Sequence, residues 1–259
     1  TEFCSRLERT RAWVTTASMN EGRYKYTATR LGNGKVIVTG GHDYEFPKKT
    51  VELYDPVLNT WTYATPMLNS HSWHTATLLG DGKLLVTGGW YGPSFPPNAE
   101  VYDPATDLWT AIGAPSSNRN SAAAVLLPSG KVLLTGGEKV GGGCCNAIPE
   151  VYDPSVNAWS PVAPMLQGRR GHAAMLLPDG RVLVVGGTSS AQPGSAELYD
   201  EATNTWTPTG PMGSNHGACT LSLLANGKVL VTGGWEVFAT ELYDPVTNTW
   251  SPTGAMSTF

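Results

Sequence analysis

GKLLVTGG, at residues 82–89, reads as a short buried β-strand that ends in a glycine pair. Four near-copies occur along the chain, namely GKVIVTGG (34–41), GKVLLTGG (130–137), GRVLVVGG (180–187) and GKVLVTGG (227–234). Each copy is followed by a tyrosine in ELYDP or a close variant, and then by a tryptophan. The period is about 48 residues, which is typical of a repeat architecture.

Each repeat is long enough for four short strands. In the second repeat we predict strands at Thr75–Leu79, Lys83–Thr87, Glu100–Tyr102 and Leu108–Ala111. A single four-stranded unit cannot bury both of its faces, so the repeats must pack on one another. The glycine pair lets two backbones approach closely, and the tyrosine and tryptophan supply large apolar plates for the contact.

A glycine pair, a tyrosine and a tryptophan at this period resemble the bacterial-type Kelch repeat. The resemblance implies an all-β Kelch β-propeller, and we predict five four-stranded blades, with six blades, one of them incomplete, as the alternative. Residues 12–259 are expected to form this single domain, with a strand at Trp13 closing the ring. Residues 1–11 match no later repeat, and we expect them to be a non-native or disordered leader.

Composition narrows the range of functions. A net charge of −4 argues against nucleic acid as a partner, because phosphate binding requires a basic surface. No run of 18 apolar residues is present, so we expect no membrane span. The four cysteines do not suggest a disulfide framework in a chain of 259 residues. We expect a monomer that is extracellular or on the cell surface.

The unusual side chains cluster in two kinds of connection. All five histidines lie in loops or blade-to-blade crossings that antiparallel pairing brings to one face of the disc. Eleven positions before the glycine of each tight turn stand Arg23, His71, Arg119, Arg169 and His216. Eight positions before it stand Tyr26, His74, Ala122, His172 and Cys219. Each set should form a ring around the mouth of the channel.

The first functional hypothesis is a divalent metal site, with zinc as the expected metal, that supports ester or phosphoester hydrolysis. Imidazole and thiolate ligands suit zinc, and the expected ligands are His74, His172, His71, His216, His42 and Cys219. Arg23, Arg119, Arg169 and Tyr26 would act on the developing charge as catalytic groups. A distant resemblance to the galactose oxidase propeller implies copper held by tyrosine and histidine as a less favoured alternative.

The second hypothesis is recognition of a small molecule or carbohydrate without chemistry. Trp73, Trp90, Trp235 and Tyr91 could stack on sugar rings, and arginine could hold a carboxylate. The Kelch resemblance also implies a protein-binding module that uses the same loop face. The sequence leaves these alternatives open.

Overall fold

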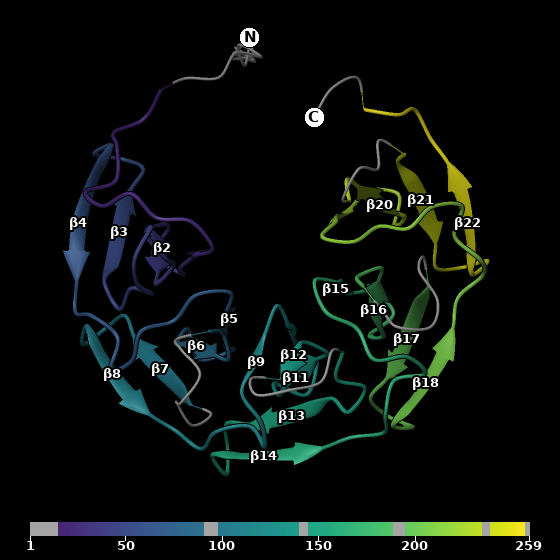
Figure 1. Cartoon of the computed structure of the whole chain (residues 1–259), viewed down its shortest axis with the longest axis horizontal. Coiled ribbons are helices and arrows are strands. Elements are labelled where there is room, and N and C mark those ends of the chain that lie inside the picture. Colours follow the sequence, from purple (N-terminus) through teal and green to yellow (C-terminus); the bar gives the residue numbers. More distant parts are fainter. Residues whose placement is uncertain (1–14, 91–97, 140–144, 189–194, 235–238, 257–259) are drawn as a thin grey trace, which may run out of the picture.

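The chain forms five four-stranded antiparallel sheets, which follow one another around an arc (Figure 1). The structure is a computed structural model that describes residues 15–90, 98–139, 145–188, 195–234 and 239–256. Within each sheet the strand order follows the chain order, from the inside of the arc to the outside. The prediction of an all-β protein with five four-stranded blades is therefore confirmed.

We number the blades in chain order. Blade 1 comprises β1 (Thr27–Arg30), β2 (Val36–Thr39), β3 (Val51–Asp55) and β4 (Thr60–Ala64). Blade 2 comprises β5 (Thr75–Leu78), β6 (Leu84–Thr87), β7 (Ala99–Asp103) and β8 (Leu108–Ala111). Blade 3 comprises β10 (Ala123–Leu126), β11 (Val132–Thr135), β13 (Glu150–Asp153) and β14 (Ala158–Pro161). Blade 4 comprises β15 (Ala173–Leu176), β16 (Val182–Val185), β17 (Ala196–Asp200) and β18 (Thr205–Pro208). Blade 5 comprises β19 (Thr220–Leu223), β20 (Val229–Thr232), β21 (Glu241–Asp244) and β22 (Thr249–Pro252).

The first two strands of a blade are joined by a tight turn whose backbone conformation requires glycine. In blade 2 the Leu79 N–H donates to the Lys83 carbonyl at 2.8 Å, and Gly82 has φ 85°. A left-handed residue is needed there, and glycine adopts it without a steric penalty. In this blade the predicted strand bounds match the observed ones at four ends and differ by one residue at the other four, and Leu108–Ala111 matches β8.

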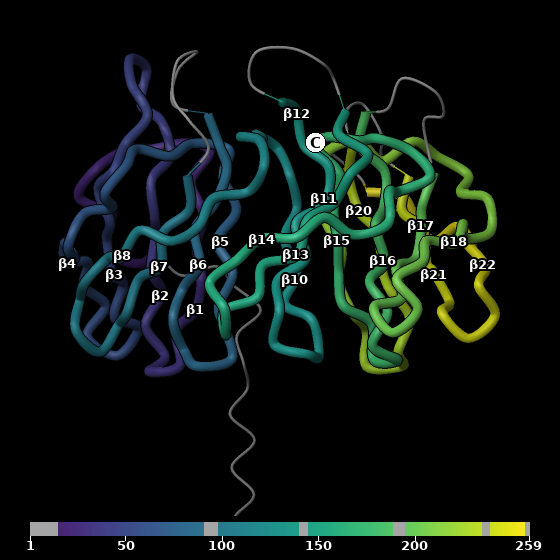
Figure 2. Tube along the Cα trace, turned by 90° about the horizontal axis from the view of Figure 1, so that it is seen from below, coloured from purple at the N-terminus to yellow at the C-terminus, as the bar shows by residue number. Residues whose placement is uncertain are grey.

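The core lies between blades rather than within one of them. Leu85 and Ala99 of blade 2, for example, pack against Val132 and Tyr152 of blade 3. Outside this apolar layer, the Trp109 indole N–H donates to the carbonyl of Thr65 in the preceding crossing at 2.8 Å. The same tryptophan lies 5.0 Å from the Tyr102 ring, centroid to centroid. The repeated tyrosine and tryptophan thus serve blade-to-blade packing, as predicted. Figure 2 shows the blades side by side.

The glycine pair is a second point of contact between blades. The Gly89 N–H donates to the carbonyl of Arg119 in the next blade at 2.8 Å. A Cβ on Gly88 would lie 2.5 Å from that same carbonyl oxygen. Only glycine leaves room for so close a backbone approach.

The described part of the arc is open between blade 5 and blade 1 (Figure 1). Leu230 of β20 is only half-buried, whereas its counterpart Leu133 is fully buried. Among the described residues, a Cβ on Gly233 would meet no atom within 4 Å. The predicted closing strand at Trp13 and the predicted leader at residues 1–11 lie outside the described residues.

A two-stranded sheet, β9 (Arg119–Asn120) with β12 (Glu138–Lys139), was not predicted. It extends blade 3 at the end of the disc where the crossings and loops meet (Figure 2). Across the described residues, no helix is long and apolar enough to cross a membrane.

Gly88, which faces a following blade, and Gly233, at the open end of the arc, provide a matched test of the glycine pair. Gly88 and Gly233 have φ values of 72° and 77°, so alanine meets the same backbone strain at both positions. Alanine at 88 also meets the Arg119 carbonyl, and we expect Gly88→Ala to lower the free energy of unfolding by about 1–3 kcal/mol more than Gly233→Ala. Urea denaturation measures the difference. Equal losses would contradict the role assigned to the close approach.

Candidate functional site

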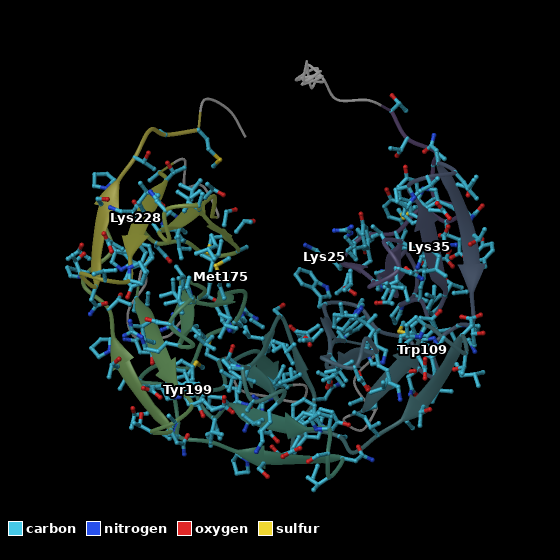
Figure 3. All side chains as sticks on the ribbon, turned by 180° about the vertical axis from the view of Figure 1, so that it is seen from behind. Lys25, Lys35, Trp109, Met175, Tyr199 and Lys228 are labelled. Atoms are coloured by element: carbon cyan, nitrogen blue, oxygen red, sulfur yellow. The ribbon has the colours of Figure 1, made fainter. Side chains whose placement is uncertain are left out.

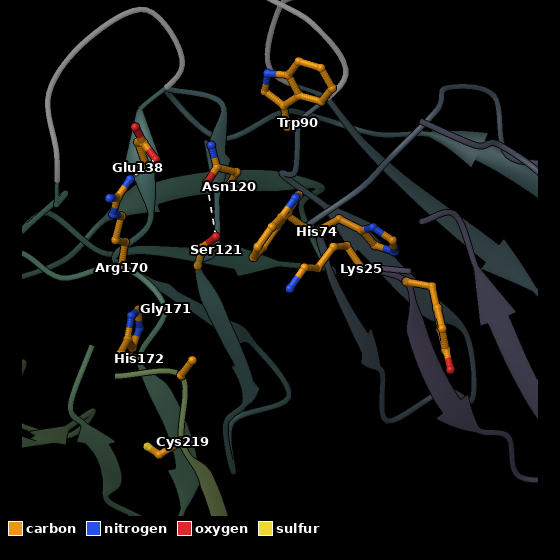
Figure 4. A pocket seen from close by; sticks show the side chains of 14 residues that line it. Lys25, His74, Trp90, Asn120, Ser121, Glu138, Arg170, Gly171, His172 and Cys219 are labelled. Carbon is orange, nitrogen blue, oxygen red and sulfur yellow. Dashed lines mark hydrogen bonds and ion pairs between the residues drawn. The ribbon is translucent and has the colours of Figure 1, made fainter. Parts of the chain in front are cut away.

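A cavity of about 670 Å³ opens at the centre of the arc, where all five blades meet (Figure 4). Its walls come from the crossings that precede β1, β5, β10, β15 and β19, together with Trp90 and Glu138 from the loops after β6 and β11. These are the two kinds of connection in which the sequence concentrates its unusual residues. The volume suits a small ligand or one unit of a larger one.

A chain of backbone hydrogen bonds lines this cavity. Each crossing contributes one residue with positive φ, namely Lys25, Trp73, Ser121, Gly171 and Ala218. From Trp73 onward, the N–H of each donates to the carbonyl of the one before, at 2.7–3.1 Å. Positive φ is uncommon for residues such as tryptophan and lysine, and strained residues of this kind cluster at ligand sites.

The three ring arginines are buried within their own blades. Arg23 donates to Glu52 at 2.8 Å, Arg119 pairs with Glu150, and Arg169 pairs with Glu197. Each guanidinium also donates to the carbonyl of the first glycine of its blade's glycine pair. Their side chains are 0–1% exposed. They are therefore structural groups, and the described contacts give no support to the catalytic role predicted for Arg23, Arg119 and Arg169.

His71 and His216 occupy the same position in blades 2 and 5. His71 Nδ1 lies 2.8 Å from the Gly88 carbonyl oxygen, and its Nε2 lies 3.0 Å from Glu100 Oε1. His216 makes the equivalent contacts with Gly233 and Glu241 at 2.7 and 2.9 Å. Both ring nitrogens of each histidine are thus engaged, and neither side chain is exposed.

The glutamates that hold these five residues were missed by the sequence analysis. Each one also accepts backbone N–H groups of the crossing, as Glu100 does from Leu68 and Asn69 at 2.7 and 3.1 Å. We call this arrangement the glutamate clamp, formed by Glu52, Glu100, Glu150, Glu197 and Glu241. A signal for these glutamates was available in the sequence, because a glutamate stands at the same position in the third strand of every blade. A charge that is buried in a strand must be paired.

His74 and His172 fasten adjacent blades to each other. His74 Nε2 lies 3.0 Å from Thr39 Oγ1 of blade 1, and His172 Nε2 lies 2.8 Å from Thr135 Oγ1 of blade 3. The Nδ1 atom of each is buried and has no hydrogen-bond partner among the described residues. Burial first, and nearby Arg169 second, lower the pKa of His172 to about 3. Burial also lowers the pKa of His74 well below its ordinary value.

The remaining members of that ring lie on the cavity wall. Tyr26 is 41% exposed. Cys219 is the free cysteine of the described chain, and burial raises its pKa to about 11, so it remains a thiol at neutral pH. In blade 4, which precedes Cys219, the residue directly before the glycine pair is Val185 rather than threonine, so the hydroxyl that a histidine would bind is absent there.

The structure does not bring the predicted metal ligands together. Across the described ranges, no group of three or more His, Cys, Asp or Glu side chains could hold a metal ion. His71 and His74 are neighbours, with ring centroids 5.6 Å apart, but each has its nitrogens turned into blade contacts. His42 lies away from both, with Nδ1 3.0 Å from the Tyr24 hydroxyl. These donor atoms do not fit a zinc or copper centre.

Aromatic and charged side chains face the cavity instead. Two of the predicted stacking residues line the cavity, Trp73 at 42% exposed and Trp90 at 38% exposed. The Lys25 ammonium lies 3.9 Å from the Trp73 ring centroid, a cation–π contact. Figure 4 shows Arg170 beside Glu138, with which it forms an ion pair. The predicted ligand contacts Tyr91 and Trp235 lie outside the described residues.

Arg170 and Lys25 were not among the residues predicted from sequence. Arg169 and Arg170 are adjacent, yet the first is buried under the glutamate clamp and the second lines the cavity. Cys145 forms a disulfide, which the sequence analysis did not predict.

Five four-stranded blades around an axial cavity define a β-propeller domain. A family model described as the Kelch motif matches residues 23–68, 74–116 and 169–213, more than half of the chain, and the chain belongs to this family. It is 36% identical over 55 residues to Kelch-like protein 35 of Mus musculus, a match that covers 21% of this chain and 9% of the mouse protein.

Among solved structures, the chain is similar to a fungal alcohol oxidase of the AA5 family, determined in complex with copper. The TM-score is 0.55 at 20% identity, and the match covers 83% of this chain and 59% of the oxidase. At this identity the similarity shows the fold alone. The chain thus spans less than two thirds of the oxidase and about a tenth of the mouse protein.

Removal of one clamp glutamate should be costly. Glu197→Ala leaves the buried Arg169 guanidinium without its carboxylate and frees two N–H groups of the crossing, Leu166 and Gln167. We expect a loss of about 3–5 kcal/mol in the free energy of unfolding, measured by urea denaturation. The exposed Glu45→Ala is the control and should change it by less than about 0.5 kcal/mol. Comparable small losses in both variants would contradict the clamp.

The buried histidines make stability depend on pH. The folded-state pKa of His172 lies below its unfolded value, so its contribution is present above about pH 6.5 and is lost as pH falls toward 3. We expect His172→Gln, which keeps a polar group near Thr135 without titrating, to lose less stability than the parent between pH 7 and pH 5. Urea denaturation at both pH values measures the change. Parallel losses would contradict the buried neutral state.

Proposed function

We propose that this Kelch propeller is a carbohydrate-binding module whose axial cavity holds an acidic sugar without chemical conversion. The observation that carries the proposal is the convergence of two half-exposed tryptophans and a cationic side chain on one cavity. Sugar recognition needs an apolar plate for the ring face and polar groups around its edge.

The apolar part of the proposed site is Trp73 and Trp90. A large ring that is more than a third exposed leaves apolar area in water, which a sugar ring could cover. Trp73 is held in place by its backbone, because its N–H donates to Lys25 and its carbonyl accepts from Ser121. A fixed ring loses little entropy on binding.

The polar part of the proposed site is positively charged. Arg170 is paired with Glu138, but among the described residues Lys25 has no acidic partner. Lys25 therefore supplies one uncompensated positive charge at the cavity wall, and Figure 3 labels it on the inner side of the arc. Asn120 and Ser121 add neutral hydrogen-bonding groups. A carboxylate on the sugar would complement this charge.

No observation among the described residues favours the metal-dependent hydrolase, which stays a prediction from the sequence. An extracellular location is part of our proposal, and the disulfide at Cys145 supports it, because disulfides persist in oxidising compartments.

Calorimetric titration with uronic acids and their neutral counterparts tests the proposal. We expect Trp73→Ala to weaken binding about tenfold, through loss of the stacking plate. Lys25→Gln should remove most of the preference for acidic over neutral sugars. Lys35→Gln is the matched control, because Lys35 lies by a tight turn and pairs with Asp55 at 3.2 Å. The proposal would be overturned if none of these sugars bound, or if the two lysine variants had equal effects on binding.

A further inference from the structure

An aromatic strip leads out of the cavity over blades 1 and 2. It consists of Trp90, His42, Tyr24 and Tyr44, and we call it the aromatic rim. Consecutive ring centroids are 5.8, 5.4 and 6.4 Å apart, in that order. Trp90 lines the cavity, Tyr24 is 45% exposed and Tyr44 is 99% exposed. The strip therefore runs continuously from the cavity wall into solvent.

Among blades 1 to 4, where the structure describes the equivalent positions, the rim lies on blades 1 and 2. Its inner members are in equivalent bridge positions, where Tyr24 pairs with His42 in blade 1 and Ser72 with Trp90 in blade 2. In blades 3 and 4 the same positions hold Asn120 with Glu138 and Arg170 with Thr188. The backbone is repeated, but its side chains change from aromatic to polar and charged. The aromatic side chains therefore lie beside the cavity on the side of blades 1 and 2.

The loop that carries the outer part of the rim is held by charge. Lys48 Nζ lies 2.9 Å from Asp43 Oδ2 and 3.1 Å from Glu21 Oε2. Asp43 also accepts the N–H groups of Phe46 and Glu45, and these bonds and Lys48 lower its pKa. Exposed aromatic rings on a fixed loop are available to a ligand at a small entropic cost.

We infer that the ligand is an oligosaccharide, with one acidic unit in the cavity and further units stacked along the aromatic rim. This inference rests on the proposed function and adds the length and direction of the ligand. The terminal unit is held by Trp73, Trp90 and Lys25, and the chain leaves over His42, Tyr24 and Tyr44. Successive ring-on-ring contacts favour a chain of planar-faced units over a single sugar.

Calorimetric titration with a series from the monosaccharide to the hexasaccharide of one uronic acid tests this inference. We expect the hexasaccharide to bind at least about tenfold more tightly than the monosaccharide, since each stacked ring adds a favourable contact. Tyr24→Ala and Tyr44→Ala should remove most of this gain and leave monosaccharide affinity unchanged. Tyr63→Ala, an exposed tyrosine on the outer strand β4, is the matched control and should change neither affinity.

The outcomes separate the two proposals. Affinity that is independent of chain length, or Tyr24 and Tyr44 variants that bind all lengths as the parent does, would overturn the rim and leave the sugar-binding cavity standing. The rim would also be overturned if these variants weakened the monosaccharide as much as the hexasaccharide. Absence of binding to every sugar in the series would overturn the proposed function, and the rim with it.

Discussion

The buried pairing of a glutamate with an arginine or histidine is the interaction on which the rest of this propeller depends. Glu197, for example, holds Arg169 and two backbone N–H groups of the crossing between blades 3 and 4. Arg169 in turn bonds the carbonyl of Gly186, which fixes the glycine pair. Burying charges is expensive, so each pair is tolerable only when every partner is present. The crossing that forms the cavity wall is thereby held by the blade that follows it in the chain.

The glycine pair of one blade contacts the clamp partner of the next blade. The Gly137 N–H donates to the carbonyl of Arg169, the residue that the clamp of blade 4 immobilises. Two residues further on, Gly171 donates to Ser121 and continues the backbone chain around the cavity. The position of each cavity residue is therefore set by two blades at once, which is what a rigid binding site requires.

The sequence predicts the fold well because packing positions repeat, and it predicts the site poorly because side-chain direction does not follow from spacing. The ring at Arg23, His71, Arg119, Arg169 and His216 was located correctly, but its members point into the blades, toward glutamates that were read as part of a strand. His74 and His172 face threonines Thr39 and Thr135, a pairing between blades that no local motif reveals. Arg170 was overlooked because its neighbour matched the repeat.

The residues free to recognise a ligand are those that the repeated contacts do not use. In each crossing the clamp partner is committed to packing, as are the threonine-facing His74 and His172, whereas residues such as Trp73 and Lys25 extend into the cavity. These positions can vary without disturbing a blade, because their structural duty is met by the backbone alone. The aromatic side chains of blades 1 and 2 and the polar ones of blades 3 and 4 are therefore available for the ligand recognition that we propose, since packing does not require either.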